Sequence, residues 1–286
     1  MPSKIKITDY ISPILEILAD KSADRKKELH KFLYPHRKLM RIHLSNQFEI
    51  ERDIETILTP EWRQKLRGFK LSDWQAVADE VYSRARKLLG NIPAPEIVLL
   101  PSFGSCNGRV YRFNKKPILA LSPDFGYCRG NNLRILIAHE YGHFLRDHLA
   151  QVKTESHYVY RNFFEEGFAT YFSRQIYPQI PNNIIYMYKL HPVINMPDPS
   201  EGYLGWCRNN MDVLKTIAIK AIKSKSHADM KRFFQCGRFK DDNTPIRVGY
   251  FLGTELITRL AEELPLKKIV RLKPSPSQMR KWLERL

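Results

Sequence analysis

Residues 137–145 read IAHEYGHFL, with two histidines four residues apart and a glutamate directly after the first. Residues four apart on an α-helix project from the same face, so His139 and His143 can direct their imidazoles at one point. Glu140 is turned by about 100° around the helix axis, so it can approach such a point without sharing it. The other interpretation is a buried helix whose histidines form hydrogen bonds within the core.

The pattern H-E-x-x-H is typical of zinc sites in which the glutamate acts as the general base. The residues around it favour a metal-binding helix. Apolar residues precede the motif, Asn131 and Asn132 could cap the start of the helix, and Gly142 leaves room for another element. We therefore expect a helix that carries a Zn²⁺ site, with Glu140 as the catalytic base.

A third ligand must come from elsewhere, because catalytic zinc usually has three protein ligands and one open position for water. A metzincin-type site needs a histidine six residues after His143, but Leu149 occupies that position, and Arg146 stands where a glycine is expected. His148 and His157 remain possible ligands, although neither has a characteristic spacing.

The segment EEGFATYF (165–172) contains a stronger candidate, Glu166, which lies 23 positions after His143. It belongs to a helix that we expect to begin near Asn162. If that helix packs against the first one, it brings a carboxylate to the metal. The other interpretation of Glu165 and Glu166 is a pair of solvated acids near a helix N-terminus, where the dipole favours negative charge.

The combination of HEYGH with a later EGFA resembles the gluzincin metallopeptidases. In that family the glutamate of an E-G-x-A segment is the third zinc ligand, so the resemblance implies this role for Glu166. Glu165 occupies the position where the aminopeptidase branch commonly has asparagine. The aminopeptidase signature G-x-M-E-N is absent, so the sequence favours an endopeptidase.

A third segment, RVGYFLGTELITRL (247–260), resembles the G-Y-x-x-G segment of a family of predicted zinc-dependent proteases. The resemblance covers roughly residues 90–275, in the same order of elements. It implies that Tyr250 donates a hydrogen bond to the oxyanion. Arg247 is a weaker candidate for binding a substrate carbonyl or carboxylate. The other interpretation is a packing helix in which two glycines, four residues apart, allow close approach.

A second family has a similar pattern. In regulatory, anti-repressor-type metallopeptidases, H-E-x-G-H is followed by a glutamate, an alanine three residues on and a phenylalanine six residues on. Glu166, Ala169, Phe172 and Pro178 fit this pattern. The segment around Tyr250 is not part of it.

The order of elements predicts a mostly helical α+β protein with a small mixed sheet before the H-E-x-x-H helix. The resemblance described above implies that this fold is zincin-like. Residues 1–90 look helical, and 91–286 would form the catalytic domain, unless the two are continuous. Three strands are expected: EIVLL (96–100), RVYRF (109–113) and PILALS (117–122).

Two features near the site have competing interpretations. PILALS could be an edge strand that aligns an extended peptide by backbone pairing, or a strand that simply belongs to the core. Asp147, one turn after His143, could support a metal ligand or be a solvated helix charge.

The net charge of +17 suggests attraction to nucleic acid, acidic lipid or acidic substrates. The basic residues are spread in pairs, and no zinc-finger or RNA-recognition motif occurs. The main alternative to a free peptidase is therefore a regulatory or nucleic-acid-associated zinc protein.

The four cysteines, Cys106, Cys128, Cys207 and Cys236, lie far apart, which favours reduced thiols without excluding a Cys106–Cys128 disulfide. The N-terminus lacks a signal-peptide pattern, and no run of 18 apolar residues indicates a membrane span. We expect a cytoplasmic protein, although export without a signal peptide would leave the same sequence.

Overall fold

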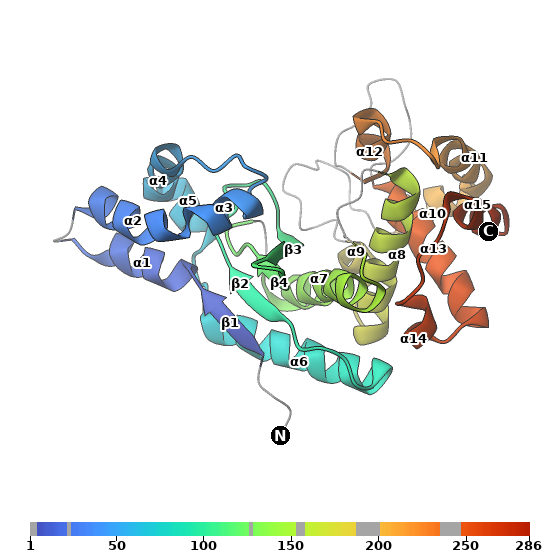
Figure 1. The fold of residues 1–286 in the computed structure, drawn as a ribbon, viewed down its shortest axis with the longest axis horizontal. Helices are drawn as coiled ribbons and strands as arrows, with labels where there is room; N and C mark the ends of the chain where they lie inside the picture. Colours follow the sequence, from blue (N-terminus) through green and yellow to red (C-terminus); the bar gives the residue numbers. More distant parts are fainter. Residues whose placement is uncertain (1–4, 22–23, 126–127, 153–157, 187–200, 235–246) are drawn as a thin grey trace.

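A four-stranded mixed sheet precedes the helix that carries His139 and His143 (Figure 1). The computed structural model describes residues 5–21, 24–125, 128–152, 158–186, 201–234 and 247–286. The strands are β1 (Lys6–Asp9), β2 (Glu96–Leu99), β3 (Gly108–Phe113) and β4 (Lys116–Leu121). Their order is β1-β2-β4-β3, and only β3 is antiparallel to its neighbour. The mostly helical α+β architecture predicted from the sequence is confirmed.

Strand β1 lies in the segment that the sequence predicted to be helical. Residues Lys6–Asp9 pair in parallel with Glu96–Leu99. Four residues are too few to show a clear alternation of polar and apolar side chains, and the partner strand is remote in the sequence. The predicted boundary at residue 90 stays a prediction, although β1 joins the first strand expected beyond it.

Strand β4 is not an edge strand, so of the two interpretations of PILALS the structure supports the core strand and contradicts the peptide-aligning edge. It lies between β2 and β3, and its residues Ile118–Leu121 are buried. A short continuous apolar run is the pattern of a strand that is covered on both faces. The edge strand that follows β4 in the sheet order is β3.

The described portion of the first 90 residues contains seven helical segments: α1 (Ile11–Ala19), α2 (Arg25–Leu33), the 3₁₀ turn η1 (Tyr34–His36), α3 (Arg37–His43), α4 (Ile50–Leu58), α5 (Pro60–Lys65) and α6 (Leu71–Leu89). Local signals predict several of their ends. The hydroxyl of Thr59 accepts a hydrogen bond from the backbone N–H of Trp62 and caps α5. Gly90, with φ of 82°, ends α6.

The remaining helices are α7 (Gly130–Ala150), α8 (Val159–Ile176), α9 (Asn182–Ile185), α10 (Glu201–Asn209), α11 (Met211–Ala221), α12 (His227–Phe234), α13 (Val248–Glu263), α14 (Leu266–Ile269) and α15 (Pro276–Glu284). Two starts differ from the prediction. Arg129, not an asparagine, is the N-cap of α7, and no side chain caps this helix. Helix α8 begins at Val159, three residues before Asn162. Val159 is buried, and its N–H, which has no partner within the helix, donates to the carbonyl of Ser224.

Small residues let α8 pack closely between α7 and α13 (Figure 1). A Cβ atom on Gly142 of α7 would lie 3.0 Å from the Cα of Ala169 in α8. On the other side of α8, a Cβ on Gly167 would lie 2.2 Å from the carbonyl carbon of Gly253 in α13. The E-G-x-A and G-Y-x-x-G segments therefore meet through their glycines, and this contact fixes α13 beside the helix that carries Glu166.

Gly253→Ala is expected to destabilise the protein by about 2 kcal/mol or more, because overpacking a tight helix contact forces the backbones apart. The added methyl group would lie 2.1 Å from the carbonyl oxygen of Phe163. Gly205→Ala in α10 is the control, because nothing lies within 4 Å of its Cβ position, and it should stabilise by about 0.5–1 kcal/mol. Urea unfolding measures both changes. Equal midpoints for Gly253→Ala and the wild type would contradict the packing argument.

Three cysteines, Cys106, Cys128 and Cys207, carry free thiols, as the sequence favoured, and Cys236 lies outside the described residues. Over the part of the chain that the structure describes, no helix is both long and apolar enough to cross a membrane.

Candidate metal centre

Helices α7 and α8 bring three metal-binding side chains to one point. The Nε2 atoms of His139 and His143 lie 3.2 Å apart. The Glu166 Oε2 atom lies 3.2 Å from the first of them and 3.4 Å from the second. His139 and His143 are buried, and Glu166 is partly exposed. The convergence of two imidazoles and one carboxylate that the sequence predicted is present.

The spacing of these donor atoms fits a single small cation. Tetrahedral ligands at about 2.1 Å from an ion lie roughly 3.4 Å from one another. The three observed separations, 3.2, 3.2 and 3.4 Å, are close to that value. Two imidazole nitrogens and one carboxylate oxygen also form a donor set that suits zinc, and three protein ligands leave one position open. The residues therefore fit a metal ion.

The three side chains have strongly coupled charges. Burial lowers the pKa of His139 to about 4, although a hydrogen bond to Glu166 opposes the shift. Burial also disfavours a charged His143. The negative charges of the nearby acids, above all that of Glu166, have the larger combined effect and raise the pKa of His143 to about 9. Burial alone would raise the pKa of Glu166, yet the His143 charge and hydrogen bonds from both imidazoles hold it well below 4.5. Glu166 is therefore ionised, as binding to a cation requires.

Glu140 lies beside this cluster without belonging to it. Its side chain is 5% exposed, and it faces the start of the edge strand β3. A Cβ atom on Gly108 would lie 2.6 Å from the Glu140 Cγ atom, so only glycine leaves room for the carboxylate. Burial raises the pKa of Glu140 to about 7, although the charge of His143 acts against this shift. A carboxylate with this pKa can accept and return a proton near neutral pH.

The first turn of α13 covers the other side of the cluster. The ring of Tyr250 stacks on that of His139, with 6.0 Å between centroids. The guanidinium carbon of Arg247 lies 3.9 Å from the centre of the Tyr250 ring. Burial raises the pKa of the Tyr250 hydroxyl, while the charge of Arg247 acts in the opposite direction. Both residues thus lie at the cluster, and their catalytic roles stay predictions.

The backbone at Arg247 is held in an unusual conformation. Its φ of 61° lies in the left-handed region, which is costly for a residue with a Cβ atom. The hydroxyl of Tyr203 donates a hydrogen bond to the Arg247 carbonyl at 3.1 Å. Strain of this kind persists where the surroundings fix it, and here it turns the chain into α13 so that Tyr250 faces His139.

Sequence reasoning missed a buried ion pair behind Glu166. Glu165 is 2% exposed, so it is not a solvated acid. The Arg146 Nη2 and Nε atoms donate to its two carboxylate oxygens at 2.7 and 3.1 Å. The Arg146 Nη1 atom donates to the carbonyls of Val270 and Leu272 at 2.9 and 2.6 Å. Arg146 therefore links α7, α8 and the segment after α14. Its partner Glu165 directly precedes the candidate ligand Glu166.

The other residues that the sequence proposed are not in the cluster. Asp147 is buried and pairs with Arg112 of β3 at 2.7 Å, so it is not a solvated charge. This pair links α7 to the edge strand. His148 is exposed, and its ring stacks on Phe144. His157 lies outside the described residues.

No protein-family model, no curated protein and no solved structure matches this chain. The likeness to zincins therefore depends on the site itself: a buried His139–His143–Glu166 triad on α7 and α8, with the spacing of an H-E-x-x-H…E centre.

Proposed function

We propose that this protein is a zinc-dependent peptidase of the gluzincin type. The observation that supports it best is that three donor atoms lie at tetrahedral ligand spacing and that a separate, buried carboxyl group, that of Glu140, lies beside them. A structural metal site has no need of such an acid. In this proposal His139, His143 and Glu166 hold the ion. When bound there, zinc supplies Lewis acidity, which lowers the pKa of water and polarises a carbonyl group.

Glu140 performs the proton transfers in this proposal. Its carboxylate accepts a proton from the water molecule that attacks the peptide carbonyl, and then delivers that proton to the leaving nitrogen. Tyr250 donates a hydrogen bond to the negative oxygen that develops on the carbonyl carbon. Arg247, which lies against the Tyr250 ring, binds a carbonyl or carboxylate of the substrate.

The edge strand β3 is the proposed site of substrate alignment. Its N-terminal residue, Gly108, lies against Glu140, and β4 pairs with one side of the strand. The other side of β3 has no partner strand among the described residues. An extended peptide can pair there by backbone hydrogen bonds, with its scissile bond near the base. A chain that pairs along an open edge can extend past both ends of the site, in keeping with an endopeptidase.

Glu166→Ala is expected to weaken zinc binding by roughly a hundredfold or more, because it removes one of three protein ligands. Protein purified without added metal should hold about one zinc per chain as wild type and almost none as the variant. Mass spectrometry of the metal content measures this. Glu140→Gln is the matched control, since it alters an acid beside the cluster and should leave the zinc content unchanged. Equal zinc contents in Glu166→Ala and the wild type would refute its role as a ligand.

The alternative, a regulatory or nucleic-acid-associated zinc protein, is supported only by the net charge of +17. Binding to DNA that weakens steeply with salt would favour it, because phosphate contacts release counterions. Peptide cleavage that is unaffected by added DNA would favour the free peptidase.

A further inference from the structure

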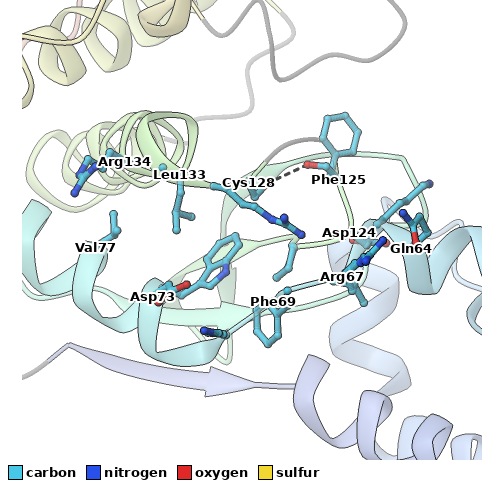
Figure 2. A pocket seen from close by; sticks show the side chains of 18 of the residues that line it. Gln64, Arg67, Phe69, Asp73, Val77, Asp124, Phe125, Cys128, Leu133 and Arg134 are labelled. Atoms are coloured by element: carbon cyan, nitrogen blue, oxygen red, sulfur yellow. Dashed lines mark hydrogen bonds between the residues drawn. The ribbon is translucent and has the colours of Figure 1, made fainter.

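A second candidate site is a cavity at the N-terminal end of α7, where the link between α5 and α6 faces the first turn of α7 (Figure 2). Its volume is about 920 Å³, within the range of sites for small molecules. None of the three candidate metal ligands lines it. The cavity is therefore distinct from the metal centre, and a ligand could bind in it whether or not the protein is a peptidase.

The inner wall of this cavity is apolar. Trp74 and Leu133 are buried, at 3% exposure each, and both line it together with Phe69 and Val77. These side chains come from α6, from the start of α7 and from the link that precedes α6. Figure 2 shows Phe69, Val77 and Leu133 around one space. A wall of this kind suits an aliphatic or aromatic body.

The rim of the cavity is cationic. Lys65, Arg67, Lys70 and Arg129 line it and are exposed. Among the described residues, none of these four forms an ion pair. A fifth lining cation, Arg134, pairs with Glu80. The rim therefore offers several positive groups that have no negative partner in the described part of the chain.

Arg129 is placed to meet a ligand at the start of α7. Its guanidinium lies beside Gly68, where a Cβ atom would come within 3.4 Å of the Nη2 atom. Gly68 has φ of 77°, so the turn there needs glycine, which leaves space for the guanidinium. Arg129 is also the N-cap of α7, a helix that no side chain caps. The positive end of the helix dipole therefore adds to the charge of the arginines.

The acidic residues of the lining do not neutralise this rim. Asp124 is 1% exposed and already accepts hydrogen bonds from the Trp62 indole and from the backbone N–H groups of Ser102 and Phe103. It is part of the wall. Asp73 is the other acid of the lining, against five cations.

We propose that this cavity binds an amphipathic anion, with a carboxylate or phosphate group at the arginines and an apolar body against Trp74. A guanidinium can donate two parallel hydrogen bonds to either anion. The apolar wall supplies binding energy in proportion to the area of the ligand that leaves water. Both parts are needed, so neither a free inorganic anion nor a neutral amphiphile satisfies the site.

Decanoate, decyl phosphate, decanol and inorganic phosphate test the two requirements, with the wild-type chain as the starting protein. Calorimetry should show one site for decanoate or decyl phosphate, and the two together tell which anion is preferred. Tryptophan fluorescence should change on binding, because Trp74 lies in the wall. Decanol and phosphate should each bind about tenfold more weakly or worse. If neither amphipathic anion binds, or if decanol binds as tightly as decanoate, the proposal is wrong.

The double variant Arg67→Ala/Arg129→Ala should lower the affinity for the preferred anion about tenfold or more, since both changed residues are exposed and the fold should remain. Arg41→Ala is the matched control, because it removes an exposed arginine that does not line the cavity. Ala76→Trp, which fills the lining from α6, gives a second, independent variant. Binding that survives both the double variant and Ala76→Trp places the anion elsewhere and overturns the proposal.

Discussion

Glu140→Gln is expected to lower kcat for peptide cleavage about a thousandfold, with the zinc content unchanged. The amide cannot accept the proton of the attacking water, and loss of a general base typically costs 10²–10⁴-fold in rate. Glutamine has nearly the same shape as glutamate, so it fits the space that Gly108 leaves beside residue 140. The change therefore removes the proton acceptor and leaves the packing of α7 against β3 intact.

Release of fluorescent fragments from a labelled unfolded protein, such as casein, measures this loss beside metal analysis of the same samples. Glu61→Gln is the control, because it makes the same chemical change at an exposed residue of α5. Its activity should equal that of the wild type. An activity of Glu140→Gln within tenfold of wild type would remove Glu140 from the mechanism, even if zinc is present.

The candidate site could be predicted from the sequence because its information is local. The positions of His139 and His143 need only a helix and a spacing of four. Glu166 was harder to predict, because its role depends on a second helix that packs against the first. The glycine and alanine of the same EGFA segment indicate such packing, and both lie at helix contacts, Gly167 on α13 and Ala169 on α7.

Features that depend on contacts between distant residues, and that no sequence motif marks, could not be predicted. Strand β1 is too short for a periodic pattern, and its partner β2 lies far along the chain. Strand β4 lies inside the sheet because it pairs with β2 on one side and with β3 on the other. Hydropathy alone does not show which strand takes the edge. Arg146 and Glu165 look like ordinary surface charges in the sequence, because neither spacing nor composition shows that they face each other in the core.

The Arg146–Glu165 pair gives the largest expected effect on stability. Arg146→Met should destabilise the protein by about 3–5 kcal/mol, because it leaves the Glu165 carboxylate buried without a partner. It also removes the donor to the carbonyls of Val270 and Leu272. Methionine keeps much of the side-chain volume, so the loss reports the missing hydrogen bonds and charge more than a cavity. Urea unfolding measures the change, and Arg280→Met in the exposed pair with Glu284 should cost about 0.5 kcal/mol or less.

The double variant Arg146→Met/Glu165→Leu separates the two causes. Replacing both partners of a buried ion pair by apolar residues is often close to neutral, so the double variant should recover the part of the loss that comes from the unpaired Glu165 carboxylate. The part that comes from the carbonyls after α14 should remain. Glu165 precedes the candidate ligand Glu166, so the double variant also tests whether the ion pair orients the metal site. If it does, the zinc affinity of the double variant should fall even though its stability is partly restored. If the Arg146→Met variant proves as stable as the Arg280→Met variant, the buried pair does not hold α8 in place.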